Sequence, residues 1–396
     1  MKRRDCLALL GASSLLLAGC ASTGPAPSLV GTGDLGVVVA RSTGTLAIVN
    51  TSQRKLLAEV KGLGDLSHAS VVFSRDARHA FVFGRDGALT KVDLLTQRIA
   101  GRVMQAGNSI GGAISADGSL VVAQNYTPGG IKAFDTATLE LVADVPAEFE
   151  PGRLSRVVGL VDLPGRRFAY SLFDADAIWI TDLSNPARPV TTKLPNIGHQ
   201  PYDALVTPNG RHYIAGLFGE DGLAMVDLWE EKPQVRRILA GYGRGQEPLP
   251  VYKMPHLRGW AVAGRRAYLP AIGRHEVLVV DATTWKEVGR IPVRGQPVFV
   301  MARPDGRQVW VNFAFPDNGK MDVIDTLAGK VVHAFEPGKG ILHMEFAPRG
   351  EAVWLSARDD NKVLIVDTTS FKTLGEIAAD NPSGIFFTSR AHRTGF

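Results

Sequence analysis

The sequence is poor in cysteine, and this scarcity excludes several kinds of site. Cys6 and Cys20 are the only cysteines in 396 residues. They are too few for a disulfide framework or a cysteine metal cluster, and Cys20 alone would remain if the first 19 residues were removed. No Cys-x-x-Cys-His motif occurs, so no c-type haem is attached to this chain.

Other absences narrow the fold and the function further. No stretch has a sustained helical period, and neither a Gly-Lys-Ser/Thr phosphate loop nor a His-Glu-x-x-His motif is present. The formal net charge is +5, and removal of a leader with three basic residues and one acidic residue would lower it to +3. A charge this small does not favour nucleic acid as a partner.

Residues 1–19 have the pattern of a bacterial lipoprotein signal peptide. A basic start, Met1-Lys2-Arg3-Arg4, precedes an apolar run that is too short to span a bilayer and ends in Leu17-Ala18-Gly19-Cys20. This ending resembles the lipobox, in which the cysteine is acylated after cleavage. We expect a lipidated Cys20 with a flexible tether over residues 20–33, and a periplasmic protein held at the membrane, more often the outer membrane, by lipid only. Arg3-Arg4 leave Sec and Tat export both open.

A hydrophobic pair followed by Asp or Asn recurs along the chain. Successive repeats are 42 to 54 residues apart, which is the spacing of four-stranded propeller blades. The eight anchor residues are Asn50, Asp93, Asp135, Asp182, Asp227, Asp281, Asp325 and Asp367. Tight-turn sequences such as Ser115-Ala116-Asp117-Gly118 and Arg303-Pro304-Asp305-Gly306 precede most anchors, as expected between the first and second strands of a blade.

The first and last repeats complement each other. The repeat that contains Asn50 lacks an upstream innermost strand, and Gly384–Thr388 follows the last repeat without a partner. The sequence therefore predicts an all-β fold, an eight-bladed β-propeller over residues 34–396 that is closed by a C-terminal strand in blade one. Two four-bladed domains would need a linker near the middle, and the longest insertion, Gly241–Pro255, is short for that purpose.

Histidines and arginines gather at one end of the predicted ring. They fall before or within innermost strands, or at the ends of second strands: Arg41, His68, Arg85, Arg156, His199, His256 and His343. Tyr126, Tyr202 and Phe315 would add flat apolar walls. Such a mouth suits anions and offers imidazole to a metal, so a planar metallo-macrocycle with several carboxylates, such as haem, fits the mixture.

Three segments resemble a known family. His68-Ala69-Ser70, Gly84-Arg85-Asp86-Gly87 and Val92-Asp93 resemble the eight-bladed haem d1 domain of cytochrome cd1 nitrite reductase. The resemblance covers residues 35–396 and is most specific over residues 37–93 and 245–281. It implies that His68 is the axial ligand of the haem iron and that Arg41 and Arg85 lie near the haem carboxylates.

The resemblance also implies catalytic candidates. His256 falls on one of the two distal histidines that serve nitrite reduction, whereas the second falls on Arg303. Because of this departure and the missing c-type haem, we do not expect nitrite reduction. His256 is then the candidate for proton transfer, with Arg303 as its electrostatic partner, while Tyr126, Arg156 and Tyr202 complete the predicted cofactor-binding set.

The predicted function is a periplasmic lipoprotein that binds haem d1 or a late precursor of the dihydro-haem d1 type. It would act in haem d1 biosynthesis or in delivery to nitrite reductase, with other haem d1 biosynthesis proteins as partners, and the resemblance suggests a homodimer. The residues leave open whether the protein transforms the tetrapyrrole or only holds it. Two alternatives remain: an outer-membrane scaffold for protein assembly without a cofactor, and a lactonase-type hydrolase with a divalent metal held by Asp174, Asp203 and Asp359.

Overall fold

The computed structural model describes residues 31–243, 260–271, 274–393 and 395. The predicted signal peptide, Cys20 and His256 therefore lie outside the described residues, as does most of the predicted tether. Within the described ranges, no helix combines the length and the hydrophobicity that crossing a membrane would require.

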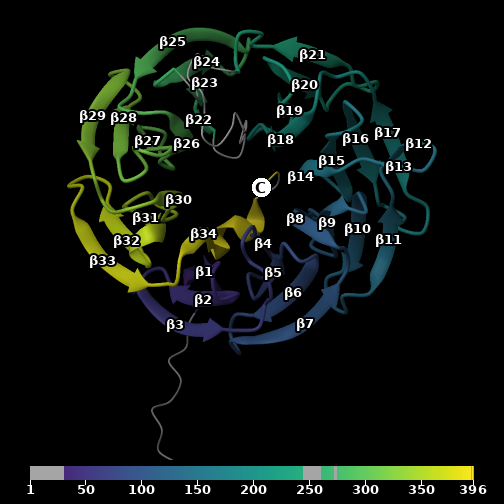
Figure 1. Cartoon of the computed structure of the whole chain (residues 1–396), viewed down its shortest axis with the longest axis horizontal. Coiled ribbons are helices and arrows are strands. Elements are labelled where there is room, and N and C mark those ends of the chain that lie inside the picture. Colours follow the sequence, from purple (N-terminus) through teal and green to yellow (C-terminus); the bar gives the residue numbers. More distant parts are fainter. Residues whose placement is uncertain (1–30, 244–259, 272–273, 394, 396) are drawn as a thin grey trace, which may run out of the picture. The chain divides into compact units, whose positions relative to one another are not determined.

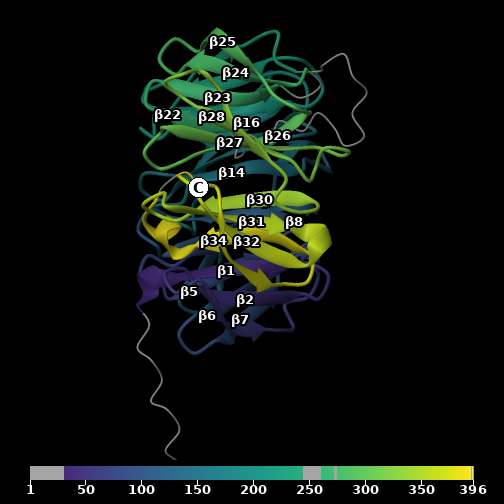
Figure 2. The same cartoon turned by 90° about the vertical axis from the view of Figure 1, so that its left-hand side faces the viewer.

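Residues 31–396 form one compact unit, in which eight four-stranded antiparallel sheets are arranged as the blades of a ring (Figure 1). The predicted all-β, eight-bladed propeller is confirmed. In blades 2 to 8 the first strand along the chain lies at the middle of the ring and the last at its outer wall, and Figure 2 shows the same ring from its edge. Short 3-10 turns are present at Thr32–Asp34 (η1), Arg358–Asp360 (η3) and Thr388–His392 (η4).

The blades are numbered around the ring, and their strands are given from the innermost to the outermost. Blades 1 to 4 contain β34 (Pro382–Phe387), β1 (Leu35–Ala40), β2 (Thr45–Asn50) and β3 (Lys55–Val60); β4 (Ser70–Phe73), β5 (His79–Phe83), β6 (Ala88–Asp93) and β7 (Arg98–Met104); β8 (Asn108–Ile114), β9 (Leu120–Thr127), β10 (Gly130–Asp135) and β11 (Leu141–Val145); β14 (Val157–Leu163), β15 (Arg167–Leu172), β16 (Ala177–Asp182) and β17 (Val190–Leu194). Blades 5 to 8 contain β18 (Pro201–Val206), β19 (His212–Leu217), β20 (Leu223–Asp227) and β21 (Val235–Ile238); β22 (Ala261–Ala263), β23 (Arg266–Ala271), β24 (Glu276–Asp281) and β25 (Lys286–Pro292); β26 (Pro297–Ala302), β27 (Gln308–Phe313), β28 (Met321–Asp325) and β29 (Lys330–Phe335); β30 (Ile341–Phe346), β31 (Ala352–Ala357), β32 (Lys362–Asp367) and β33 (Thr373–Ala378). A small hairpin of β12 (Glu148–Glu150) and β13 (Arg153–Leu154) precedes blade 4.

The repeating aspartate has a local structural cause. In blade 3, the carboxylate of Asp135 accepts hydrogen bonds from the backbone N–H groups of Ala137 and Thr138, at 2.8 and 2.9 Å. The aspartates of blades 2, 6, 7 and 8 accept the same pair of bonds. The anchor therefore closes the turn between the third and fourth strands, which explains why it recurs once in each blade.

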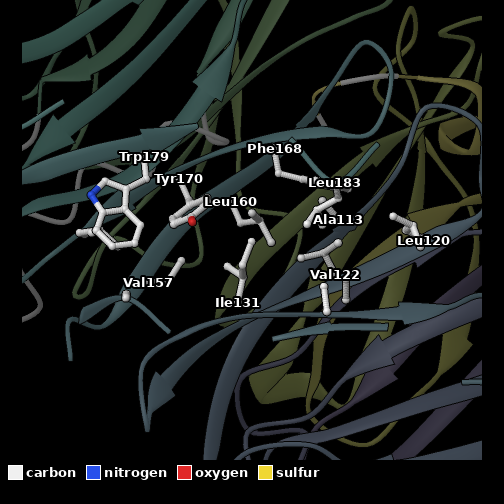
Figure 3. Packing of buried hydrophobic residues seen from close by; sticks show 14 of the residues in the cluster. Ala113, Leu120, Val122, Ile131, Val157, Leu160, Phe168, Tyr170, Trp179 and Leu183 are labelled. Atoms are coloured by element: carbon white, nitrogen blue, oxygen red, sulfur yellow. The ribbon is translucent and has the colours of Figure 1, made fainter. Parts of the chain in front are cut away.

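Blade-on-blade packing provides the core. Side chains of blade 3, such as Ile131 and Val122, meet Leu160, Phe168 and Tyr170 of blade 4, and all of these are at most 1% exposed (Figure 3). Inner strands are buried on both faces of the sheet, so they are continuous hydrophobic runs, whereas the outermost strands are largely exposed.

The two ends of the chain meet in blade 1. β34 pairs antiparallel with β1, with Val37 opposite Phe386, and thus supplies the innermost strand of that blade. His343, on the innermost strand of blade 8, lies at this seam and accepts a hydrogen bond at Nδ1 from the backbone N–H of Ile385, at 3.1 Å. Its own backbone N–H donates to Ser356 Oγ at 2.7 Å. The neutral imidazole therefore connects blade 8 to the closing strand.

The seam makes stability depend on pH. Burial lowers the pKa of His343 from 6.5 to about 3, with the neighbouring charge of Arg390 as a second cause. The unfolded chain binds a proton below about pH 6.5, and the folded chain does not until about pH 3. The free energy of unfolding should therefore fall as the pH drops, by up to about 1.4 kcal/mol per pH unit inside that window. Chemical denaturation between pH 7 and pH 5 measures this slope.

His343→Gln should reduce the slope, because Gln offers an acceptor for Ile385 and does not titrate. The matched control is His333→Gln on the outermost strand of blade 7, which should leave the contribution of His343 intact. An unchanged slope in His343→Gln would contradict this account of the seam.

Candidate functional site

Six of the predicted site residues lie at one face of the ring, which we call the rim face. It is the face where innermost strands begin and where second strands turn into third strands. His68 precedes β4, Arg156 precedes β14 and Tyr202 is the second residue of β18. Tyr126 is near the end of β9, and the remaining two residues, Arg41 and Arg85, occupy the turns after β1 and β5. Because the strands of a blade alternate in direction, both kinds of position reach the same face.

The loop that contains His68 is held between blades 1 and 2. The guanidinium of Arg41 donates a hydrogen bond to the carbonyl of Ser67, and the backbone N–H of Arg85 donates to the carbonyl of Asp65 at 2.8 Å. Hydrogen bonds from Ser67 lower the pKa of Asp65, and the charges of Arg85 and Arg41 act in the same direction. His68 is exposed in this loop, directly after Ser67.

An aromatic wall extends across blades 3, 4 and 5. Tyr126 and Tyr202 approach each other with their hydroxyl oxygens 3.2 Å apart. Phe173 lies edge-on to Tyr202, with ring centroids 6.0 Å apart, and Phe218 packs against both rings at 5.8 and 5.9 Å. Buried Ile110 and Val158 pack with this group in one hydrophobic cluster.

The two tyrosines stay protonated. Burial raises the pKa of Tyr126, and it also raises the pKa of Tyr202, where the neighbouring Tyr126 and the negative charge of Asp203 add to the effect. Two neutral hydroxyls in contact share one hydrogen in their mutual bond. The second hydrogen can be donated to a ligand, so the wall combines apolar rings with one donor.

Two interlocking β-bulges aim Tyr202 into this wall. The β18–β19 register shifts between Pro201 and Ala204, and the β14–β15 register shifts at Gly159. A Cβ on Gly159 would lie 2.8 Å from the backbone nitrogen of Ala204 and 2.9 Å from the carbonyl oxygen of Tyr202. Gly159 also has a φ of +62°. The close approach of the two strands, and with it the placement of Tyr202, therefore requires glycine.

The three rim arginines differ in their partners. Arg156 forms a two-pronged pair with Asp174, at 3.0 and 2.6 Å, and its guanidinium lies 4.2 Å from the centre of the Phe173 ring. Arg41 and Arg85 form no ion pair with a described carboxylate within 4.0 Å. Arg85 instead lies 5.8 Å from the centre of the Tyr126 ring. Burial and the charge of Arg358 lower the pKa of Arg41, and the negative charge of Asp65 acts in the opposite direction. Arg41 and Arg85 could thus pair with the carboxylates of a ligand, whereas the charge of Arg156 is already neutralised by Asp174.

Arg303 is not brought to this face. It follows β26 in the turn to β27, at the opposite end of an innermost strand from the end that Tyr202 occupies, and its guanidinium pairs with Asp305 at 2.8 and 2.6 Å. We expected Arg303 beside the other site residues, and its position in the structure shows that this expectation is wrong. Its predicted partner His256 lies outside the described residues.

The carboxylates of the hydrolase alternative are not assembled either. Asp174 pairs with Arg156, and Asp359 pairs with Arg358 at 2.8 Å. In the part of the chain that the structure describes, no group of three His, Cys, Asp or Glu side chains could hold a metal ion. The described residues thus offer cations and aromatic rings at the rim face, and no cluster of acidic ligands.

Sequence reasoning missed Phe173 and Phe218, and it considered Asp174 only as a metal ligand of the hydrolase alternative. All three follow second strands: Asp174 has the repeat position of Arg85 in blade 2, and Phe173 and Phe218 have the position of Gly84. An alignment of the repeats by their anchors would have placed them at the rim face. The contacts among them depend on the bulges, which the sequence pattern does not reveal.

Comparisons with known proteins agree with the predicted resemblance. The family model described as Cytochrome D1 heme domain matches residues 30–391. Two proteins named Protein NirF, from Stutzerimonas stutzeri and Pseudomonas aeruginosa, are 58% and 57% identical to the chain and cover 98% and 96% of it, with 98% and 97% of their own lengths matched. The dihydro-heme d1 dehydrogenase of Pseudomonas aeruginosa is 27% identical over 80% of the chain and 64% of its own length.

Among solved structures, the dihydro-heme d1 dehydrogenase NirN in complex with DHE has a TM-score of 0.80 at 24% sequence identity. The match covers 94% of this chain and 79% of that one. This likeness supports the propeller fold.

The bulge geometry generates a prediction. Gly159→Ala should lower the free energy of unfolding by about 1–3 kcal/mol, because it adds a clash with backbone atoms to a left-handed conformation. The matched control is Gly165→Ala, which has a φ of +80° and no atom within 4 Å of the added Cβ. Urea denaturation should show a clearly larger loss for Gly159→Ala, and equal losses would mean that steric contact at the bulge is unimportant.

Proposed function

The chain belongs to the cytochrome D1 heme domain family, and from this membership we propose that it binds haem d1 or one of its late precursors at the rim face. We propose further that it takes part in haem d1 biosynthesis or in delivery of haem d1 to nitrite reductase. The observation that carries the proposal is the pair of rim arginines, Arg41 and Arg85, which form no ion pair within 4.0 Å with a described carboxylate, together with the aromatic wall that Arg85 adjoins. A flat ring with acidic side chains would complement both features.

The residues of the rim face fit such a ligand in named roles. Arg41 and Arg85 would pair with its carboxylates, and His68, in the loop between them, would ligate the metal. Tyr126 and Tyr202 would donate a hydrogen bond to an oxygen at the ring edge, because their raised pKa values keep them neutral. Arg156 would hold Phe173 in place through its pair with Asp174. When bound, the group supplies a redox-active iron and a conjugated ring.

The relatives support a role in haem d1 biosynthesis. The chain matches both NirF proteins over nearly their whole length, and a protein named dihydro-heme d1 dehydrogenase is a more distant relative. A precursor of the dihydro-haem d1 type is thus a reasonable ligand. His256 is the proposed proton donor if the protein transforms the ligand, and this role rests on the sequence resemblance. Nitrite reductase, other haem d1 biosynthesis proteins and a second copy of the chain are the proposed protein partners.

We propose that the protein acts in the periplasm as a lipoprotein that is anchored through Cys20. This proposal rests on the lipobox-like Leu17-Ala18-Gly19-Cys20 after a basic and apolar leader. A tether over residues 20–33 would let the propeller move near the membrane surface.

An absorption titration with haem d1 tests the binding site. The wild-type chain should bind tightly, and His68→Ala should change the iron spectrum. Arg85→Gln should weaken binding about 10- to 100-fold, because a charge-assisted hydrogen bond contributes about 1.5–3 kcal/mol. The control is Arg307→Gln, an exposed arginine in the turn after β26, at the opposite face, which should bind like the wild type. Absence of any spectral change in the wild type would favour the scaffold alternative.

Membrane fractionation tests the anchor. Cys20→Ser should move the protein from the membrane fraction to the soluble periplasmic fraction, because an unacylated chain keeps no lipid. The control is Cys6→Ser within the leader, which should remain in the membrane fraction. The mass of the mature wild-type chain is measured as well, because it shows directly whether the leader is removed and lipid is added. A wild-type mass without lipid would contradict the proposal.

A further inference from the structure

The chain continues past its closing strand, and this C-terminal segment crosses the face opposite to the rim face. The segment consists of η4 and the described residues Arg393 and Gly395, and we call it the tail. It starts at blade 1, where the hydroxyl of Thr388 donates to the carbonyls of Thr32 and Leu35, each at 2.7 Å. The start of the tail is therefore fixed to the start of the propeller.

The next attachments are to blades 8 and 2, the two neighbours of blade 1. The guanidinium of Arg390 forms a two-pronged pair with the buried carboxylate of Glu345 on β30. On the other side, Arg75 follows β4 and donates to the carbonyl of Ala391 at 2.6 Å. Ala391 is 1% exposed. The tail at this point is packed into the ring and does not extend into solvent.

The tail then reaches the far side of the ring. The backbone N–H of Gly395 donates to Asp162 Oδ1 at 3.0 Å, and Gly395 packs against Val206. Asp162 and Val206 lie at the finishing ends of β14 and β18, the innermost strands of blades 4 and 5. In a ring of eight blades, blade 4 is opposite blade 8, and blade 5 is opposite blade 1. The tail is therefore bonded to blades on both sides of the ring.

One ion pair connects this crossing to the inner wall. Asp162 is 1% exposed, and Arg75 lies 3.6 Å from its second carboxylate oxygen. The same guanidinium donates to the carbonyls of Ala391, Ile114 and Ser115. A buried carboxylate requires compensation of its charge, and Arg75 and the tail provide it together. Arg75 thus holds the tail over the end of the channel.

We propose that the tail is a plug that closes the central channel at the face opposite to the rim, so that the channel is a cup open at the rim face only. The plug itself is independent of the proposed function. Its consequence for a ligand rests on that function: a tetrapyrrole would enter and leave through the rim face. Any protein that receives the ligand would then have to approach the turns that carry Arg41 and Arg85.

Thiol labelling measures the plug without any tetrapyrrole. Val206→Cys is made in the full chain and in a chain that ends at Arg390, which keeps the attachments of Thr388 and Arg390. A water-soluble maleimide should label Cys at this position slowly in the full chain and about tenfold faster or more in the shortened chain. Arg75→Ala in the full-length background should also accelerate labelling. Peptide mass spectrometry separates this thiol from Cys6 and Cys20.

The control is Val142→Cys on β11, a half-buried valine of an outermost strand. Its labelling rate should be the same in both chains, and equal melting curves would show that the shortened chain is folded. Faster labelling of both thiols would indicate general loosening and would overturn the plug, as would equal rates at position 206 with and without the tail.

A second measurement tests the exit route. Haem d1 is bound to both chains, and its transfer to excess apomyoglobin is followed by absorption. The transfer rate should be unchanged in the shortened chain if the ligand leaves through the rim face. A faster transfer would overturn that route while leaving the labelling result intact. Failure of the wild type to bind haem d1 would count against the proposed function alone.

Discussion

Closure of the ring is the constraint on which the structure depends. Each sheet is apolar on both faces, so every blade needs a neighbour on each side, and a linear array would leave two faces in water. Pairing of β34 with β1 completes blade 1, which then packs against blade 8. His343 joins β34 to blade 8 as a neutral acceptor. The apolar faces of all eight blades are thus buried only when the ring is closed.

The same closure creates the candidate site. Radial sheets bring the starting ends of innermost strands together at one face, although the residues are far apart in the sequence. Bulges in β14 and β18 then direct Tyr202 toward Tyr126, and Arg85 lies beside them without a described carboxylate partner. At the opposite face, acidic residues such as Asp162 and Glu345 are used to hold the tail. Arg85 at the rim face thus has no described carboxylate within ion-pair distance, whereas Asp162 and Glu345 at the opposite face are bonded to the tail.

Much of this could be predicted from the sequence, for identifiable reasons. The repeated aspartates fixed the number of blades because each one closes a turn, and the strand order then placed Arg41, Arg85, Arg156, Tyr126 and Tyr202 on one face. Arg303 was misplaced because the resemblance was followed, although Arg303-Pro304-Asp305-Gly306 is itself a turn sequence of the opposite face. The contact between the tyrosines, the pair of Arg156 with Asp174 and the course of the tail depend on side-chain directions and long-range contacts, which periodicity does not encode.

The pairing of β34 with β1 also sets an order of events during synthesis. The innermost strand of the first blade is made of residues 382–387, so a ribosome must translate all seven other blades before the first blade has its full complement of strands. Until then β1 presents an unpaired edge, which nascent chains of the same kind can pair with. A premature stop codon between β33 and this strand would leave seven complete sheets and a first blade that no later step of synthesis could complete.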